Sequence, residues 1–257
     1  MKSEKIIKTS PWAWFARNVR GLLALLLIPT FFGLMGCAKG EMDKTLDETL
    51  KVLEIFAPKN QIIEAEISQL EGSLLAGLRN LVYSVEFTFK AAGLEKDAQR
   101  MALIQKRLQD EPEIVNDPDR LKEIMDEVNL ATTKANAITA EKKFNREKAK
   151  EFVGRGILHT GIAIVYDVKA INHAHTLIQV VPKAIEQNAM EALRLRRYLN
   201  LSRLVLTNVP DQLKQIKSIN QNLQDYSKDH NIPQPSQAEI DKAVKKQAPA
   251  KIDAGDL

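Results

Sequence analysis

Apolar residues recur every three or four positions over most of this chain, which is the spacing of one face of an α-helix. The strongest pattern runs over about 60–92, and shorter ones cover about 42–56 and 95–109. Within the first of these segments the repeating positions are Ile63, Ile67, Leu70, Leu74, Leu78, Leu81, Val85 and Phe89. The pattern predicts a helix about 50 Å long that packs through one apolar face.

Glycine and proline residues indicate where these helices end. Gly93 suits the C-terminal cap of the long helix, and Pro112 and Pro118 predict a turn after the helix at 95–109. The next helix is expected to start at Asp119 and to continue past residue 150. Its buried seam is expected to consist of Leu121, Met125, Val128, Thr132, Ala135 and Thr139.

Three glycines, Gly154, Gly156 and Gly161, interrupt the following stretch. They predict a hinge or helix break near 154–156. Residues 157–166 are apolar on nearly all sides, so we expect them to be buried in the core. Contact with a partner or a membrane is the alternative, although about ten residues are too few to span a bilayer.

Two prolines divide the last part of the chain. Pro182 is expected to begin or kink a helix over about 183–208, and Pro210 to open a last core helix that ends near residue 228. Beyond these, 232–257 is expected to be a mobile C-terminal tail with one short helix at about 236–247.

Two charged residues fall on apolar helix faces. Asp167 lies on the apolar face of the segment before Pro182, and Arg196 lies on the apolar face of the segment after it. The residues that share the face of Arg196 are Ile185, Ala189, Leu193 and Leu199. A buried charge needs a partner, so we expect a structural ion pair between Asp167 and Arg196. A ligand-reading charge pair in a bundle cavity is the alternative.

The first 36 residues have a different character. Five basic residues and one acidic residue precede an apolar run at 21–32, and Leu34-Met35-Gly36-Cys37 follows with the only cysteine in the chain. This layout is typical of a secretory signal. The run at 34–37 resembles the lipobox of bacterial lipoproteins, in which an aliphatic residue and small residues precede the modified cysteine. An uncleaved N-terminal anchor and a free cysteine are the alternatives.

The resemblance implies that Cys37 carries a diacylglyceryl group and that the chain is cut before it. Several acyl chains hold a protein on a bilayer far more firmly than one. Ala38 follows the cysteine in place of an aspartate, which in the sorting rule of enterobacterial lipoproteins implies the outer membrane. The expected organisation is a signal peptide at 1–36, a lipid-anchored tether at 37–41 and a bundle domain at 42–231.

Cleavage would change the charge balance. The mature chain would keep 32 basic and 32 acidic residues, so the basic isoelectric point belongs to the signal segment, and bulk charge does not favour nucleic acid as a partner. No cysteine would remain for a disulfide. The mature composition is poor in aromatic residues and favours helices. The predicted fold class is therefore all-α, an elongated antiparallel helical bundle with long amphipathic helices.

No catalytic or cofactor motif stands out. The histidines His159, His173 and His175 do not have the spacing of metal ligands on one helix face, and the chain has no Gly-x-Ser-x-Gly, P-loop or dinucleotide-binding motif. We therefore expect no enzyme activity, no metal site and no cofactor.

These observations favour a lipid-anchored cell-envelope protein, facing the periplasm, that binds or scaffolds a protein partner. One alternative is a membrane-active protein, similar to helical pore formers, that uses the segment 154–166. Another is a carrier of an apolar ligand. A charged segment, 140–151, is expected to be a solvated face, with contact to lipid headgroups as the alternative.

Overall fold

A computed structural model describes residues 59–187 and 190–247, and these residues form helices joined by short connections, without β-strands. The expected helix at 42–56, the signal segment, Cys37 and the last ten residues lie outside this range. The helices are α3 (Lys59–Ala92), α4 (Glu95–Asp110), the 3₁₀ helix η1 (Pro112–Asn116), α5 (Pro118–Ala140), α6 (Arg146–Gln187), α7 (Ala192–Asp229) and α8 (Gln237–Gln247).

The helical bundle expected from the sequence is confirmed. All eight repeating apolar positions of α3 are buried, as is the expected seam of α5. Gly93 ends α3 with a φ of 78°, a conformation that costs a glycine little. The turn between α4 and α5 is the helix η1, whose Ile114 and Val115 are buried.

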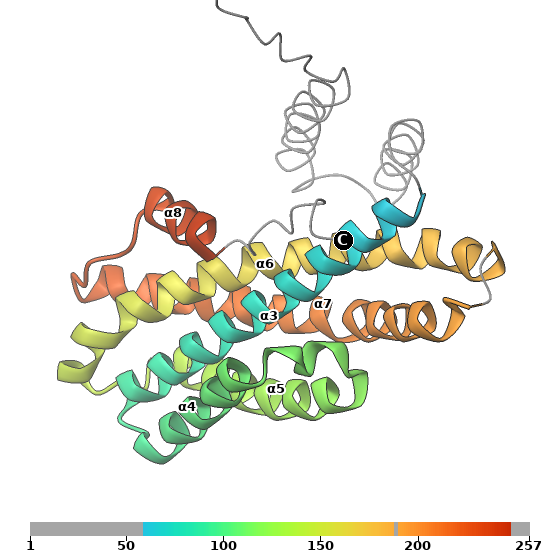
Figure 1. The fold of residues 1–257 in the computed structure, drawn as a ribbon. Coiled ribbons are helices and arrows are strands. Elements are labelled where there is room, and N and C mark those ends of the chain that lie inside the picture. The colour runs from blue at the N-terminus through green and yellow to red at the C-terminus, as the bar shows by residue number, and fades with distance from the viewer. Residues whose placement is uncertain (1–58, 188–189, 248–257) are drawn as a thin grey trace, which may run out of the picture. The chain divides into compact units, whose positions relative to one another are not determined.

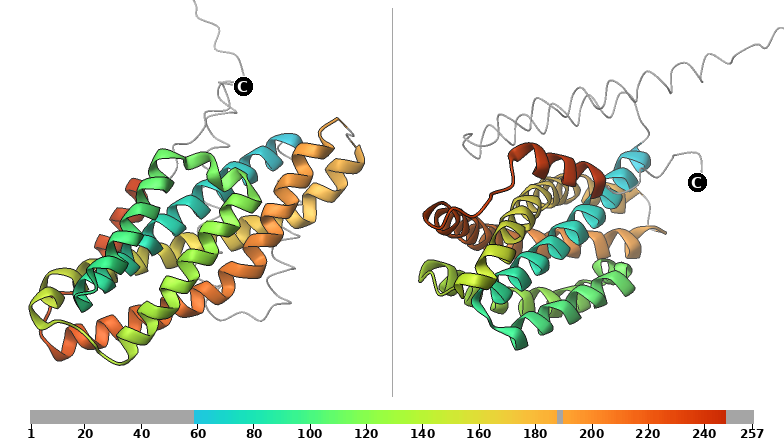
Figure 2. Two further views of the ribbon diagram at one scale, coloured as in Figure 1. Left: turned by 90° about the horizontal axis from the view of Figure 1, so that it is seen from below. Right: turned by 90° about the vertical axis from the view of Figure 1, so that its left-hand side faces the viewer.

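Successive helices run in opposite directions, which makes an up-and-down bundle (Figure 1). The α3–α6 pair shows this, because Ser84 Oγ donates to Gly156 O near one end and Glu66 contacts His173 towards the other. Helix α6 contacts α3, α7 and α8, whereas α4 packs on α3, and α5 packs on α7 and α3. Helix α8 therefore lies on the opposite side of the bundle from α4 and α5 (Figures 1 and 2).

The central position of α6 changes which of its residues form the core. Ile164, Val168 and Ile171 are only half-buried, although the sequence pattern places them on one apolar face. The covered positions over the same part of α6 include three alanines, Ala163, Ala170 and Ala174, together with Tyr166, Asp167, Leu177 and Val181. Small residues on α6 let α3 and α7 each pack close to α6, and this close packing buries the small residues.

The expectation of one helix from Asp119 past residue 150 is wrong. Helix α5 ends at Ala140, Lys142 adopts a positive φ of 51°, and α6 starts at Arg146. The Asn145 side chain caps α6 by accepting from the backbone N–H groups of residues 147 and 148. The Asn145 N–H also donates to Ala91 O, so tertiary contact supports the break.

The expected hinge near 154–156 is also wrong, because α6 is continuous through all three glycines. They are sites of close packing. A Cβ atom at Gly154 would lie 2.9 Å from Pro233 O, one at Gly156 would lie 3.2 Å from Leu223 Cδ1, and one at Gly161 would lie 2.7 Å from Ile240 Cδ1. The apolar segment that follows is only partly buried: Ile157, Ile162, Ala163 and Tyr166 are covered, whereas Leu158, His159, Ile164 and Val165 are half-buried.

Neither proline divides the last helices where the sequence predicts. Pro182 lies inside α6 and Pro210 inside α7, and the chain reverses between Gln187 and Ala192. A proline inside a helix costs about 3 kcal/mol. Buried residues flank both prolines, including Val181 beside the first and Val209 beside the second, and their packing outweighs this cost.

Residues 232–247 differ from the expected mobile tail. Ile232 is buried against the main core, and α8 is seated on α6 through the buried Ile240. The Tyr166 hydroxyl donates to Val244 O at 2.8 Å and so joins the two helices. Among the described helices, none is both long and apolar enough to cross a bilayer.

Candidate functional site

The structure does not pair Asp167 with Arg196. Asp167 is buried, as expected, with 1% of its surface exposed. Arg196 is exposed on α7, and the described residues contain no ion pair between the two. The prediction failed because it assumed one helix over 183–208 with Arg196 on its apolar face. In the structure the chain reverses after Gln187, so residues before and after this reversal do not share a helix face.

Asp167 instead lies against α3. A Cβ at Gly77 would lie 2.5 Å from Asp167 Oδ1, so only glycine leaves room for this carboxyl group. Asp167 Oδ2 has no hydrogen-bond partner. Burial without a compensating charge raises the pKa of Asp167 to about 8, which keeps the group protonated at neutral pH.

Aromatic rings gather where the end of α3 meets the start of α6. We call this the aromatic face: Tyr83 and Phe87 from α3, and Phe152 and His159 from α6. The Phe87 and Phe152 rings are stacked at 6.1 Å, and the Tyr83 ring lies 4.9 Å from that of His159. All four side chains are half-buried, so this group covers the core and also meets solvent.

A hydrogen-bond chain sets the orientation of His159. Asn80 Nδ2 donates to Ala76 O at 2.8 Å and to Gln247 Oε1 at 2.7 Å, which leaves Asn80 Oδ1 to accept from His159 Nδ1 at 2.8 Å. Burial lowers the pKa of His159 to about 4, so the ring is neutral at pH 7. This histidine therefore joins α3, α6 and α8.

Two cations border the aromatic face. Lys90 Nζ lies 5.5 Å from the Phe87 ring centre and 5.7 Å from that of Phe152. The Arg155 guanidinium lies 5.8 Å from each of the same rings. Lys90 is paired with Glu86, whereas Arg155 has no carboxylate at ion-pair distance in the described ranges. Exposed aromatic residues beside an arginine are a common composition for a protein-binding surface.

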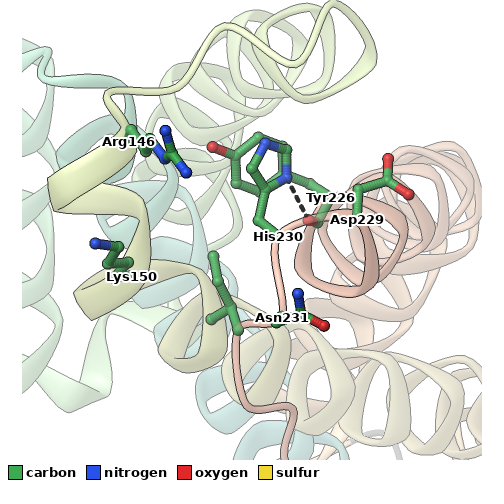
Figure 3. Close-up of a pocket in the computed structure, with 7 residues that line it drawn as sticks. Arg146, Lys150, Tyr226, Asp229, His230 and Asn231 are labelled. Carbon is green, nitrogen blue, oxygen red and sulfur yellow. Dashed lines mark hydrogen bonds between the residues drawn. The ribbon is translucent and has the colours of Figure 1, made fainter.

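A small pocket of about 150 Å³ lies beside the start of α6 (Figure 3). Its lining residues are Arg146, Lys150, Tyr226, Asp229, His230, Asn231 and Ile232. The His230 ring stacks on Tyr226 at 4.0 Å and its Nδ1 lies 2.9 Å from Tyr226 O. Arg146 extends towards these rings, so cationic and aromatic groups line the pocket. The carboxylate of Asp229 lines the same pocket, so its charges are mixed.

The other histidines of interest lie along α6. His173 Nδ1 is 2.7 Å from Glu66 Oε2, and His175, two residues further along α6, is half-buried. Within residues 59–187 and 190–247, no group of three His, Cys, Asp or Glu side chains has a geometry that suits a metal ion. The sequence analysis excluded His159 as a metal ligand and missed its place in the aromatic face.

Comparisons of the chain with models of protein families, with curated proteins and with solved structures found no match. The site must therefore be judged from its own residues. A signal for the aromatic face was present in the sequence, because Tyr83, Phe87 and Phe152 are three of the few aromatic residues after position 37. Only the antiparallel pairing of α3 and α6 brings the first two beside the third.

Proposed function

We propose that this chain is a lipid-anchored protein of the bacterial cell envelope whose helical bundle binds a protein partner. The observation that carries the anchoring is Cys37, the only cysteine, directly after an apolar signal-like run. The mass of that residue distinguishes the lipid anchor from an uncleaved N-terminal anchor or a free cysteine.

Mass spectrometry of the protein from bacterial membranes tests the anchor. The expected first residue is Cys37, with the added mass of a diacylglyceryl group and an acyl chain. Cys37→Ser should leave the precursor uncleaved and without acyl mass. A chain that begins at Met1 and carries an unmodified Cys37 in the cytosol would contradict the proposal.

The aromatic face supports the binding role. It combines half-buried rings with the exposed cation of Arg155, and it lies at the end of α3 opposite the one where the chain from Cys37 enters. Because α3 is 34 residues long, about 50 Å separates its two ends. The aromatic face therefore lies near the end of α3 that is farther from Cys37 along the sequence.

Site-specific photo-crosslinking in cells tests this surface. A photoreactive residue in place of Phe152 should give one discrete adduct, and adding Arg155→Glu should reduce its yield several-fold. The same photoreactive residue at Lys217, an exposed position on α7, is the matched control and should give no such adduct. Equal adducts at both positions would contradict binding through the aromatic face. The membrane-active and ligand-carrier alternatives stay predictions, and no contact described above favours either of them.

A further inference from the structure

The first half of α7 is strongly basic. Residues 192–210 contain the arginines Arg194, Arg196, Arg197 and Arg203 and no acidic residue. A basic stretch on one helix is usually a solvated surface, so its neighbours decide whether its charge is available to a partner.

Two of these arginines are matched within the bundle. Arg194 pairs with Glu64 of α3 and with Glu191. Arg197 lies over the Tyr198 ring at 5.3 Å and interacts electrostatically with Glu71. Arg196 and Arg203 are exposed, and no carboxylate of the described segments lies at ion-pair distance from either.

The unmatched arginines share one outward face with an exposed leucine. Helical spacing places Leu193, Arg196, Asn200, Arg203 and Thr207 along one line of α7, about 21 Å long. All five side chains are exposed, and Leu193 has 82% of its surface in solvent. We call this line the basic ridge.

The other basic segment of the chain is different. Among the bases of 140–151, Lys142, Lys143, Lys148 and Lys150 each form an ion pair with a carboxylate. Those charges are largely neutralised locally, which agrees with a solvated face. The basic ridge is therefore the better candidate for binding an extended anionic surface.

The position of the ridge indicates what that surface is. The Arg194–Glu64 pair joins the first turn of α7 to the early part of α3, so both helices begin at the same end of the bundle. Residues 38–58 connect Cys37 to that end. A segment of that length spans about 25–30 Å as a coil or a helix, whereas α6, with 42 residues, is about 63 Å long.

We propose that the basic ridge lies on the anionic phospholipid surface that holds the acylated Cys37. Arg196 and Arg203 contact lipid phosphates, and Leu193 enters the boundary between headgroups and acyl chains. This inference rests on the proposed lipid anchor. It adds a second membrane contact beside the acylated Cys37, so the face of α7 that carries the ridge is the face that lies on the bilayer.

Vesicle binding by the mature chain 37–257 with Cys37→Ser tests the ridge in the absence of the acyl anchor on Cys37. The probes are vesicles of phosphatidylcholine alone and vesicles with one quarter phosphatidylglycerol, separated from free protein by sedimentation. We expect at least ten-fold stronger partition onto the anionic vesicles. This difference should shrink as the salt concentration rises from 50 to 500 mM, because surface charges are screened.

Charge reversal identifies the residues. Arg196→Glu with Arg203→Glu should lower the partition onto anionic vesicles at least ten-fold, and Leu193→Ser should lower it several-fold. The matched control is Lys106→Glu with Lys217→Glu, which changes the net charge equally at two exposed positions outside the ridge. Circular dichroism of each variant confirms that the helices are retained.

Three results would overturn the inference: equal partition onto both kinds of vesicle, equal losses in the ridge and control variants, or self-association through the ridge in the absence of vesicles. The last result would make the ridge an interface between copies. A failure of the proposed lipid anchor can be distinguished from a failure of the ridge proposal. The anchor is tested on Cys37 of the cellular protein, whereas the vesicle assay uses a chain without a cysteine.

Discussion

At the scale of single residues, Asp167 is the clearest departure from ordinary surface chemistry. Its carboxyl group is buried beside Gly77 without a charged partner, and its pKa is raised to about 8. The folded state therefore holds this proton more tightly than the unfolded state, whose pKa is near 3.8. The contribution of Asp167 to stability is complete below pH 4 and is lost as the pH rises towards 8.

Replacing Asp167 with asparagine should remove this pH dependence. Asn is nearly the same size and cannot ionise, so Asp167→Asn should raise the free energy of unfolding at pH 8 by about 1–3 kcal/mol. Urea titrations at several pH values between 4 and 8 measure the effect. Asp211→Asn, at an exposed position of α7, is the control and should change little. A variant with the same pH slope as the parent would show that Asp167 does not carry it.

His159 should produce the opposite slope. Its pKa is lowered to about 4 in the folded state, against 6.5 for an unperturbed histidine, so the unfolded state binds the proton more tightly. Its stabilising contribution is present above pH 6.5 and is lost as the pH falls towards 4.

His159→Gln keeps a donor for Asn80 and removes the titration. In the Asp167→Asn background, the free energy of unfolding should fall by about 1–3 kcal/mol between pH 6.5 and 4, and His159→Gln should abolish most of that fall. Denaturant titrations at both pH values measure it. His175→Gln, on the same helix, controls for the loss of a histidine. An unchanged fall in the His159 variant would contradict the neutral, buried ring.

At the scale of elements, α8 has its own small contact with α6. Ile240 packs with Ile162 and Tyr166 in a cluster separate from the main core, and Gly161 leaves room for its side chain. The Tyr166 hydroxyl adds one hydrogen bond. A helix held by so few contacts should open on its own, without unfolding of the long helices.

Ile240→Ala should therefore release α8 selectively. Losing this side chain costs about 2–4 kcal/mol of packing, so amide hydrogen exchange over 237–247 should accelerate at least ten-fold while exchange in α3 stays unchanged. Asp241→Ala, on the exposed side of α8, is the control. Faster exchange throughout the bundle would show that α8 is part of the global unfolding unit.

At the scale of the whole molecule, contacts divide the chain into Met1–Ala57 and Pro58–Leu257. The second unit contains the buried core of α3 to α7, so it should fold without the first. A chain that starts at Pro58 should be highly helical by circular dichroism and should melt cooperatively, within about 3 °C of the mature chain. A broad, non-cooperative transition would show that residues 37–57 complete the core.

The sequence by itself determined the all-helical class and the buried faces of α3, α4 and α5. Each of these helices has one apolar face, such as the one from Ile63 to Phe89. Such a face appears in the sequence as apolar residues repeating every 3.6 positions. The end of α3 at Gly93 was also predictable, because glycine adopts a positive φ at little cost.

Only the tertiary structure decided the course of α6 and α7 and the composition of the aromatic face. Glycine and proline weaken an isolated helix. Gly156, and Val209 next to Pro210, lie among neighbouring helices, and the packing of these helices outweighs that local cost. The reversal between Gln187 and Ala192 then separated Asp167 from Arg196 and turned Leu193 and Arg196 outward. Local propensity is worth tenths of a kcal/mol to a few kcal/mol per residue, whereas burial acts on many side chains together.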